Sequence, residues 1–412
     1  MRDVVIIGAG PAGLFAGISC TTMGRNVTII EKTSSPGKKL LLSGGGQCNL
    51  TNAEPASAML KRYFGAGRFL RPSLMAFDSN SLKDFFEQRG LQLFSREDGK
   101  VFPATYSARD VLEVLLGECE KQGIQIRYGC GARGIELTPS GRFKLSTQAG
   151  EINADYLVIA AGGKSYQETG SSGDGYFLAE MLGHSIVSPR PALTSVSIKD
   201  FAFSDLAGIS LKEAEVTLWR NQKKVNGRRE DLLFTHEGFS GPAILHLSRE
   251  AEPEDIIKVN ISGLPREKLE ARLIELFTNE GKKLVKTALN SLLDIPDRLL
   301  TKIVEISGVG QRSCSKLTKE ERKELIRNLF ESSFAIERIG DFSQAMVTRG
   351  GVSLSEVNPK TMESRLVANL FFSGEVLDFD GETGGYNLQA AFSTGYLAGK
   401  TIKGKTSREG NQ

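Results

Sequence analysis

Histidine and cysteine, the residues that most often build metal sites and disulfide frameworks, are scarce in this sequence. The three histidines, His184, His236 and His246, do not have the spacing of metal ligands. The five cysteines are widely scattered and form no CxxC pair. We therefore expect neither a metal centre nor a disulfide scaffold, and we expect a reducing compartment.

An excess of one charge and a long apolar run are missing as well. The 52 lysines and arginines nearly balance the 49 aspartates and glutamates, which leaves no electrostatic footprint for nucleic acid. The uncharged stretch from Val4 to Cys20 is broken by glycines and falls short of the roughly 20 apolar residues of a membrane span. The sequence thus predicts a cytoplasmic protein without a membrane span that acts on a small molecule, and it disfavours a nucleic-acid partner.

What is present is a globular composition arranged in segments of different character. A length of 412 residues with 40% hydrophobic content predicts two or three domains. The first 190 residues alternate between strand-like and helical patterns in the α/β manner. Residues 192–262 carry strand-like patches, residues 266–330 show helical periodicity, and the end of the chain returns to a strand, a glycine-rich turn and a helix.

A GxGxxG motif at residues 8–13 lies between a short apolar strand and a helix, and it predicts a dinucleotide site. A second match at residues 129–134 leads into a strand-like segment, so we expect no nucleotide there. In the first motif Gly8 permits the tight turn, Gly10 lets the backbone approach a pyrophosphate, and Gly13 lets the helix pack on the strand.

An acidic residue completes the fingerprint. Glu31 ends the next predicted strand, where its carboxylate would accept hydrogen bonds from ribose hydroxyls. The pyrophosphate would lie at the positive end of the helix, on N–H groups without intrahelical partners. The motif alone fits FAD and NAD equally well.

Four stretches of the chain carry a family resemblance: KKLLLSGGGQCNLTN (38–52), NADYLVIAAGG (153–163), LLFTHEGFSGPAILHLS (232–248) and the region from Gly350 to Lys400. Together they resemble the aminoacetone-oxidase-like, or bile-acid dehydro-reductase-like, FAD-binding proteins, which are described as NAD(P)/FAD-dependent oxidoreductases. The resemblance covers essentially the whole chain. One departure from the pattern is Gln47, where a basic residue is expected.

The resemblance implies a glutathione-reductase-like, Rossmann-type FAD-binding domain with an inserted β-barrel-like domain and a small helical insert. The implied FAD-binding domain comprises 1–190 and 346–412, the β domain 191–265 and 331–345, and the helical insert 266–330. The implied cofactor is non-covalent FAD, with NAD(P)H as a candidate electron donor.

The implied FAD contacts come from both ends of the chain. The C-terminal helix would direct its first N–H groups at the N1/O2 edge of the isoalloxazine, where reduced flavin carries negative charge. Three successive glycines would let the backbone pass close to the flat ring. The residues concerned are Gly8, Gly10, Pro11, Ala12, Gly13, Glu31, Lys32, Leu40, Ser43, Gly44, Gly45, Gly46, Gln47, Cys48, Asn49, Thr51, Ala132, Arg133, Ala161, Gly162, Gly374, Glu375, Asp378, Gly385, Tyr386, Asn387 and Leu388.

No catalytic acid or base stands out. Cys48 has no second cysteine nearby, so we interpret it as a packing residue rather than as half of a redox dithiol. His184 follows a glycine at a predicted helix end and suits a cap. The weak catalytic candidates are His236 and His246 in the β domain and Arg349, which could hold a substrate carboxylate or a developing enolate.

Two enzyme reactions stay open at this point. As a reductase, the protein would pass hydride from NAD(P)H through flavin N5 to an activated double bond. As an amine oxidase of the aminoacetone type, it would use oxygen to reoxidise the flavin. Two other classes are a flavin-dependent tRNA-modifying protein, which the near-neutral charge disfavours, and a non-catalytic flavoprotein.

Overall fold

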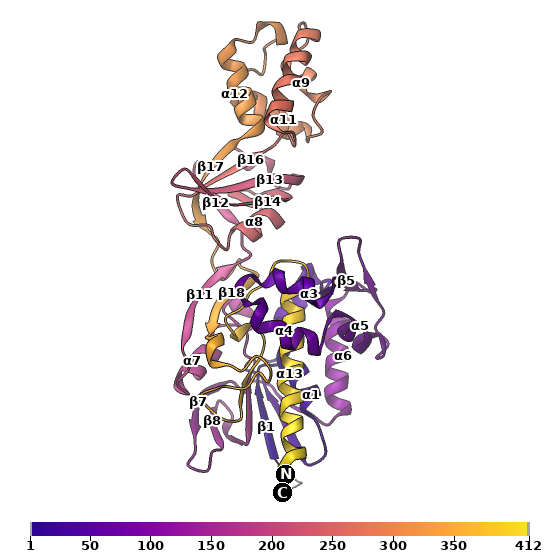
Figure 1. Cartoon of the computed structure of the whole chain (residues 1–412), viewed down its shortest axis with the longest axis vertical. Helices are drawn as coiled ribbons and strands as arrows, with labels where there is room; N and C mark the ends of the chain where they lie inside the picture. Colours follow the sequence, from indigo (N-terminus) through magenta and orange to yellow (C-terminus); the bar gives the residue numbers. More distant parts are fainter. Residues whose placement is uncertain (1, 410–412) are drawn as a thin grey trace. The chain divides into compact units, whose positions relative to one another are not determined.

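The chain, in a computed structural model that describes residues 2–409, divides into two compact units (Figure 1). Unit 1 comprises Met1–Pro191 and Met346–Gln412, and unit 2 comprises Ala192–Ala345. Each unit has a hydrophobic core of its own. Both ends of the chain therefore belong to the same unit, and the middle of the chain forms the other.

A five-stranded parallel sheet forms the centre of unit 1. Its strand order is β19-β10-β1-β2-β6, so the order reverses at β1, with β2 on one side and β10 on the other. In open α/β sheets such a reversal creates a crevice at the carboxyl ends of the strands. The strands are β1 (Arg2–Ile7), β2 (Arg25–Ile30), β6 (Gln125–Arg127), β10 (Tyr156–Ile159) and β19 (Leu370–Phe372).

Helices and three small sheets surround this centre. The small sheets are β3 (Thr51–Asn52) with β5 (Lys100–Pro103) and β4 (Leu93–Ser95), β7 (Ala132–Leu137) with β8 (Phe143–Thr147) and β9 (Gly150–Ala154), and β11 (Ile186–Ala192) with β18 (Val347–Val352). The second GxGxxG match leads into β7, as predicted. The helices are α1 (Pro11–Cys20), α2 (Lys38–Leu42), α3 (Ala56–Met59), α4 (Gly67–Ala76), α5 (Ser79–Glu87), α6 (Ala108–Lys121), α7 (Asp174–Met181) and α13 (Tyr386–Glu409).

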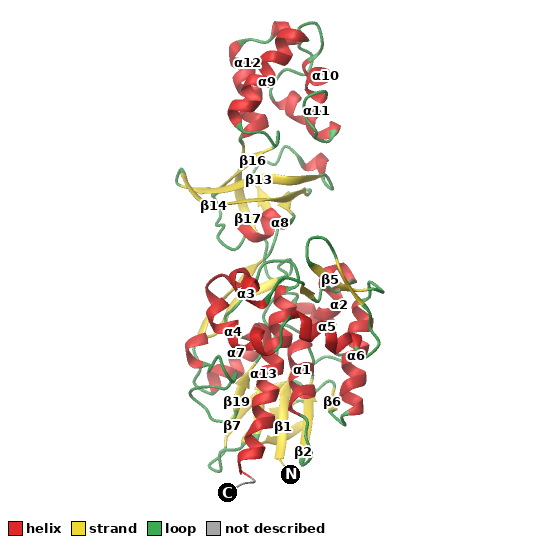
Figure 2. Cartoon of the chain, turned by 45° about the vertical axis from the view of Figure 1, so that its right-hand side comes forward, coloured by secondary structure: helices red, strands yellow, loops and turns green. Residues whose placement is uncertain are grey.

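The two ends of the chain are joined by the packing of α13 against α1, which lie side by side in Figures 1 and 2. A Cβ atom on Gly395 would lie 2.4 Å from the carbonyl oxygen of Ala12, and one on Gly399 would lie 2.5 Å from that of Ala16. The two helix backbones therefore approach so closely that only glycine fits at these positions of α13.

Unit 2 is a closed barrel that carries a helical segment. Its barrel and its helices share one hydrophobic cluster, and a capping box of Thr318 with Glu321 opens α12. The barrel order is β12-β15-β14-β13-β16-β17. The elements are β12 (Val196–Ile198), β13 (Ser210–Arg220), β14 (Lys223–Phe234), β15 (Gly238–Ser240), β16 (Ile256–Asn260), β17 (Ser332–Ile339), α8 (Pro242–Leu247), α9 (Arg266–Asn279), α10 (Val285–Asn290), α11 (Asp297–Ile306) and α12 (Lys319–Phe330).

The predicted fold class is thus confirmed: a Rossmann-type domain with an inserted β barrel and a small helical part. Across residues 2–409, no helix has both the length and the hydropathy that crossing a bilayer requires.

The cap predicted at His184 is confirmed: Gly183 is left-handed (φ +84°) and the N–H of His184 donates to the Ala179 carbonyl oxygen (3.0 Å) at the end of α7. The His184 side chain has a further role. Its imidazole is buried, with Nδ1 3.2 Å from Glu356 Oε2 and Nε2 2.9 Å from the hydroxyl of Ser364. Burial lowers the pKa of His184 below its ordinary 6.5, against the opposing effect of Glu356. The side chain therefore ties the segment after β18 to the end of α7 as a neutral group.

This pKa shift makes stability depend on pH. The unfolded chain binds a proton at His184 near pH 6.5 and the folded chain only at lower pH, so acidification favours unfolding. We expect the free energy of unfolding to fall between about pH 7.5 and about pH 5.5 in denaturant titrations, and to fall less in His184→Gln. His236→Gln is the control, since His236 is exposed; an equal effect of both substitutions would contradict the assignment.

A second prediction concerns the contact between α1 and α13. Because a Cβ on Gly395 would overlap the Ala12 backbone, we expect Gly395→Ala to lower the free energy of unfolding by about 1–3 kcal/mol. Gly404 lies on the same helix, and a Cβ added there would meet nothing within 4 Å, so Gly404→Ala should leave stability unchanged or raise it by up to about 1 kcal/mol. Thermal and denaturant unfolding of both variants test the difference.

Candidate functional site

The first glycine motif forms a tight strand-to-helix turn with one open face. Gly8 has a φ of +105°, and a Cβ atom there would lie 2.5 Å from the carbonyl oxygen of Ala160. A Cβ on Gly13 would lie 1.9 Å from the Gly8 oxygen. At Gly10, by contrast, a Cβ would meet nothing within 4 Å. The backbone of the turn is thus closely packed at Gly8 and Gly13 and open at Gly10. Gly10 precedes Pro11 and Ala12 at the start of α1, and such an open position there is what a pyrophosphate site requires.

Glu31 is held in position at the end of β2. Its Oε2 accepts a hydrogen bond from the N–H of Ala9 (3.0 Å), and its Oε1 accepts one from the N–H of Thr33 (2.8 Å). The same side chain therefore contacts the glycine turn and the next loop. Each oxygen keeps further acceptor capacity that ribose hydroxyls can use.

The neighbours of Glu31 come from two later segments of the chain. Lys32 forms an ion pair with Asp174 (2.6 Å) and a hydrogen bond with Ser172. The N–H of Cys130 donates to the Glu31 carbonyl oxygen (2.9 Å), which aligns the start of β7, with Ala132 and Arg133, beside this loop. The structure thus brings Lys32, Ala132 and Arg133, three of the predicted FAD contacts, close to Glu31.

A largely buried polar network that the sequence did not reveal lies beyond the end of β10, at the start of β18 and beside Gly374. The Lys39 ammonium pairs with Glu375 (2.6 Å), and Glu375 also accepts from the N–H of Thr348 (2.7 Å) and the hydroxyl of Ser165 (3.1 Å). Ser165 and Thr348 are fully buried. A Cβ on Gly163 would overlap Thr348, so the segment after Ala161 and Gly162 runs directly against this network.

The loop with three glycines is exposed at its centre. Gly44 and Gly45 have φ values of +58° and +66°, and a Cβ on Gly45 would meet nothing within 4 Å. Ser43 anchors the loop through a hydrogen bond to the carbonyl oxygen of the buried Leu40 (2.6 Å). The open backbone face fits the close approach of a flat ring.

Cys48 follows this loop and is fully buried. Burial raises the pKa of its thiol to about 12, against a hydrogen bond from Ser43 that lowers it. The five cysteines are all free and buried. A buried thiol of this pKa is poorly reactive, which agrees with the interpretation of Cys48 as a packing residue.

The glycine loop and the start of α13 lie against each other. The Asn49 amide accepts a hydrogen bond from the N–H of Gly385 (3.1 Å), and the Thr51 hydroxyl donates to Gln389 (2.6 Å). The N–H of Gly385 is thus already engaged, which leaves those of Tyr386, Asn387 and Leu388 as the ones at the helix start. The Asn387 side chain bonds back to the main chain of Gly381, in the loop that follows Asp378.

A second network that the sequence did not reveal surrounds the first residue of α13. The hydroxyl of Tyr386 is hydrogen-bonded to Glu54, and Arg62 bridges Glu54 and Glu382 at 3.1 Å each. The Tyr63 hydroxyl donates to the Tyr386 carbonyl oxygen (2.8 Å). Burial raises the pKa of Tyr386, so the phenol stays protonated and donates to the carboxylate.

The weak catalytic candidates are divided between the two units. His236 is exposed in the turn between β14 and β15, and the buried His246 lies 2.7 Å from Glu230; both histidines belong to unit 2. Arg349 is half-buried in β18 of unit 1. Their catalytic roles stay predictions.

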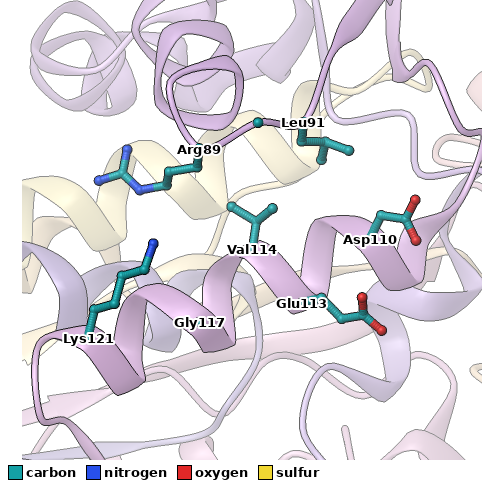
Figure 3. Close-up of a pocket in the computed structure, with 8 residues that line it drawn as sticks. Arg89, Leu91, Asp110, Glu113, Val114, Gly117 and Lys121 are labelled. Carbon is teal, nitrogen blue, oxygen red and sulfur yellow. The ribbon is translucent and has the colours of Figure 1, made fainter.

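A separate pocket of about 350 Å³ opens between the end of α5 and the outer face of α6 (Figure 3). The head groups of Arg89 and Lys121 lie at one end of it, and the carboxylates of Asp110 and Glu113 lie at the other. None of the predicted cofactor residues lines this pocket. It is therefore not part of the candidate site.

The sheet reversal, the glycine turn and the anchored acid define unit 1 as a Rossmann-type dinucleotide-binding domain. Comparison with known proteins identifies the group. The family described as "HI0933-like protein Rossmann domain" matches residues 2–401, and the chain belongs to this family.

Relatives of known name span the whole chain. A ribosomal RNA dihydrouridine synthase from Haemophilus influenzae is 31% identical over 97% of this chain and 98% of its own. A 3-dehydro-bile acid delta(4,6)-reductase from Clostridium scindens is 33% identical with the same coverage. Among solved structures, a 3-ketosteroid delta1-dehydrogenase from Sterolibacterium denitrificans has a TM-score of 0.54 at 12% identity, over 98% of this chain and 99% of that one. The protein is a flavin-dependent oxidoreductase that uses FAD.

Glu31 offers a direct test of the cofactor assignment. Replacing it by Gln keeps one acceptor for the backbone N–H groups but removes the charge that ribose hydroxyls would meet. We expect FAD affinity to fall about tenfold or more, measured by flavin retention on dialysis and by titration of the apoprotein. Glu136→Gln, an exposed carboxylate on β7, is the control. Unchanged retention in Glu31→Gln, with normal unfolding, would remove Glu31 from the site.

Proposed function

We propose that the protein reduces a carbon–carbon double bond conjugated to a carbonyl group, with NAD(P)H as the electron donor. The observation that carries this proposal is the chemistry shared by its named relatives. Formation of dihydrouridine saturates the C5–C6 bond of uracil beside a carbonyl group, and a delta(4,6)-reductase of a 3-dehydro bile acid acts on double bonds conjugated to the 3-keto group. Both reactions add a hydride and a proton across an activated double bond.

The residues of the candidate site would hold FAD in an extended conformation. The turn at Gly10 and the start of α1 would bind the pyrophosphate, and Glu31 the adenosine ribose. Glu375, oriented by Lys39 and Thr348, would contact the ribityl and phosphate region of FAD, between the adenine and the flavin ring. Bound FAD supplies hydride transfer at the flavin N5.

The start of α13 would set the electrostatics of the ring. Its first N–H groups carry the positive end of the helix dipole, which stabilises negative charge at the N1/O2 edge. Tyr386, fixed by Glu54 and Tyr63, would hold this turn in place. In this arrangement the chain's own residues would favour a reduced, anionic flavin, which the proposed reductase forms in its first half-reaction.

Two substrate classes fit this reaction. A small cyclic enone agrees with the near-neutral net charge of +3 and with the bile-acid reductase among the relatives. A uridine in RNA is the second candidate, since a relative of 31% identity is named a ribosomal RNA dihydrouridine synthase. Amine oxidation and a non-catalytic role have no comparable support.

Anaerobic mixing distinguishes these reactions. We expect NADH or NADPH to bleach the yellow holoprotein, aminoacetone to leave it yellow, and a neutral 3-keto-4,6-diene steroid or a uridine-containing ribosomal RNA fragment to restore the colour. Mass spectrometry of the acceptor should show a gain of two hydrogens.

The contrary result is equally clear. Bleaching by aminoacetone, with recovery of the colour only on admitting oxygen, would replace the proposal by amine oxidation. A saturated 3-keto steroid is the control acceptor, since it has no carbon–carbon double bond to reduce.

A further inference from the structure

An exposed arginine of unit 1 lies over a cluster of aromatic rings, which we call the aromatic platform. The guanidinium carbon of Arg96, between β4 and β5, lies 4.1 Å from the centre of the Phe102 ring and 5.9 Å from that of Tyr106. Phe94 completes the platform, with its ring centre 4.9 Å from that of Tyr106 and 6.0 Å from that of Phe102. The side chain of Arg96 is thus oriented by these rings while its charge faces solvent.

This platform adjoins the glycine loop of the candidate FAD site. The Nη2 atom of Arg96 donates a hydrogen bond to Gln47 Oε1 (3.2 Å), and a Cβ on Gly44 would lie 3.5 Å from the Phe102 ring. The hairpin is fixed there by main-chain bonds, from Leu50 to Val101 (2.9 Å) and from Ala53 to Gly99 (2.7 Å). The guanidinium therefore lies beside Gln47, the position where the sequence lacks an expected basic residue.

Nearby carboxylates balance the charge of Arg96 only in part: it contributes to the lowered pKa of Asp98, and Glu97 follows it in the sequence. The carboxylate of Asp98 pairs with Lys100 at 2.6 Å. Within residues 2–409, Arg96 forms no ion pair of its own. Two of its features, a planar fork of donors and a stacked orientation, are those that suit an arginine to bind an oxyanion by paired hydrogen bonds.

We propose that Arg96 and the aromatic platform of Phe94, Phe102 and Tyr106 form a substrate-binding subsite for a carboxylate or phosphate group. The ligand would be an unsaturated molecule that carries this oxyanion, held so that its planar part reaches the glycine loop. This proposal rests on the proposed function, because it assigns the loop to the flavin ring. Arg96 is a specificity-determining residue in this arrangement, since it binds the anion and takes no part in hydride transfer.

Binding to the oxidised holoprotein tests the subsite without turnover. Two matched pairs of probes differ in charge: benzoate with benzamide, and uridine monophosphate with uridine. The affinity of each is measured from the change in flavin absorbance and by calorimetry. We expect the wild type to bind at least one anion about 10- to 100-fold more tightly than its neutral partner, the range for a hydrogen bond to a charged group. Preference for benzoate alone identifies a carboxylate ligand, and preference for uridine monophosphate alone identifies a phosphate.

Variants assign that preference to the residue. Arg96→Gln should bring the ratio of anion affinity to neutral-partner affinity close to one, with unchanged flavin content. Arg96→Lys should keep part of the anion preference, because lysine retains the charge without the planar fork. The matched control is Arg89→Gln: Arg89 also lies over a phenylalanine ring, Phe85 at 3.8 Å, but it is paired with Glu118 and lines the separate pocket of Figure 3.

Three results would overturn the subsite: equal binding of both anions and their neutral partners by the wild type, an unchanged ratio in Arg96→Gln, or the same loss in Arg89→Gln. These outcomes are independent of the proposed reaction, since the titration requires no reduction of substrate. Anion preference together with failure to reduce any enone would refute the reaction and leave the subsite.

Discussion

Close packing of the last helix on the first is the contact on which unit 1 depends. The missing side chains at Gly395 and Gly399 let the backbone of α13 rest on that of α1. This contact fixes the start of α13, and the strand and loop before it, with respect to the glycine turn that opens α1. A dinucleotide cradle assembled from two distant parts of the chain is accurate only if such a contact is rigid, and direct backbone packing is more rigid than long side chains would be.

Polar networks then determine the details of the cradle. Lys39, Ser165 and Thr348 come from three separate segments and converge on Glu375. Lys32 and Asp174, from two further segments, form an ion pair beside Glu31. The side chains involved are partly or fully buried, where a charge is stable only with a partner. Each network therefore couples the position of one loop to that of another.

Local signals in the sequence predicted much of this structure. The apolar run at residues 3–7, the glycine motif and Glu31 lie within one βαβ unit, so their spacing alone indicated the turn and the anchored acid. Context separated the true motif from its second match, because residues after Gly134 alternate as a strand. The resemblance added the inserted barrel and the role of the C-terminal helix.

Long-range partners could not be predicted in this way. Lys39 and Glu375 are 336 positions apart, and Glu54 and Tyr386 are 332 apart, so nothing in the local pattern relates them. The small sheet of β3, β5 and β4 was missed for a similar reason: its strands are too short to show a period, and it is this sheet that brings Arg96 to the glycine loop. The glycine before His184 correctly indicated a helix cap, but the partners of the His184 side chain come from the segment after β18 and were not predicted. A four-residue spacing of glycines in α13 was the one available signal for the helix contact.

The split of unit 1 along the chain also orders events during protein synthesis. Unit 2 is a single continuous segment with its own core, so the ribosome delivers all of its residues before β19 and α13 emerge. Strand β10 precedes unit 2 in the chain and can pair with β1 early, but its other edge stays unpaired until β19 is synthesised. If α13 contributes to the cofactor site as proposed, capture of the coenzyme would be a late event in biogenesis, because a nascent chain interrupted before this helix would lack part of the site.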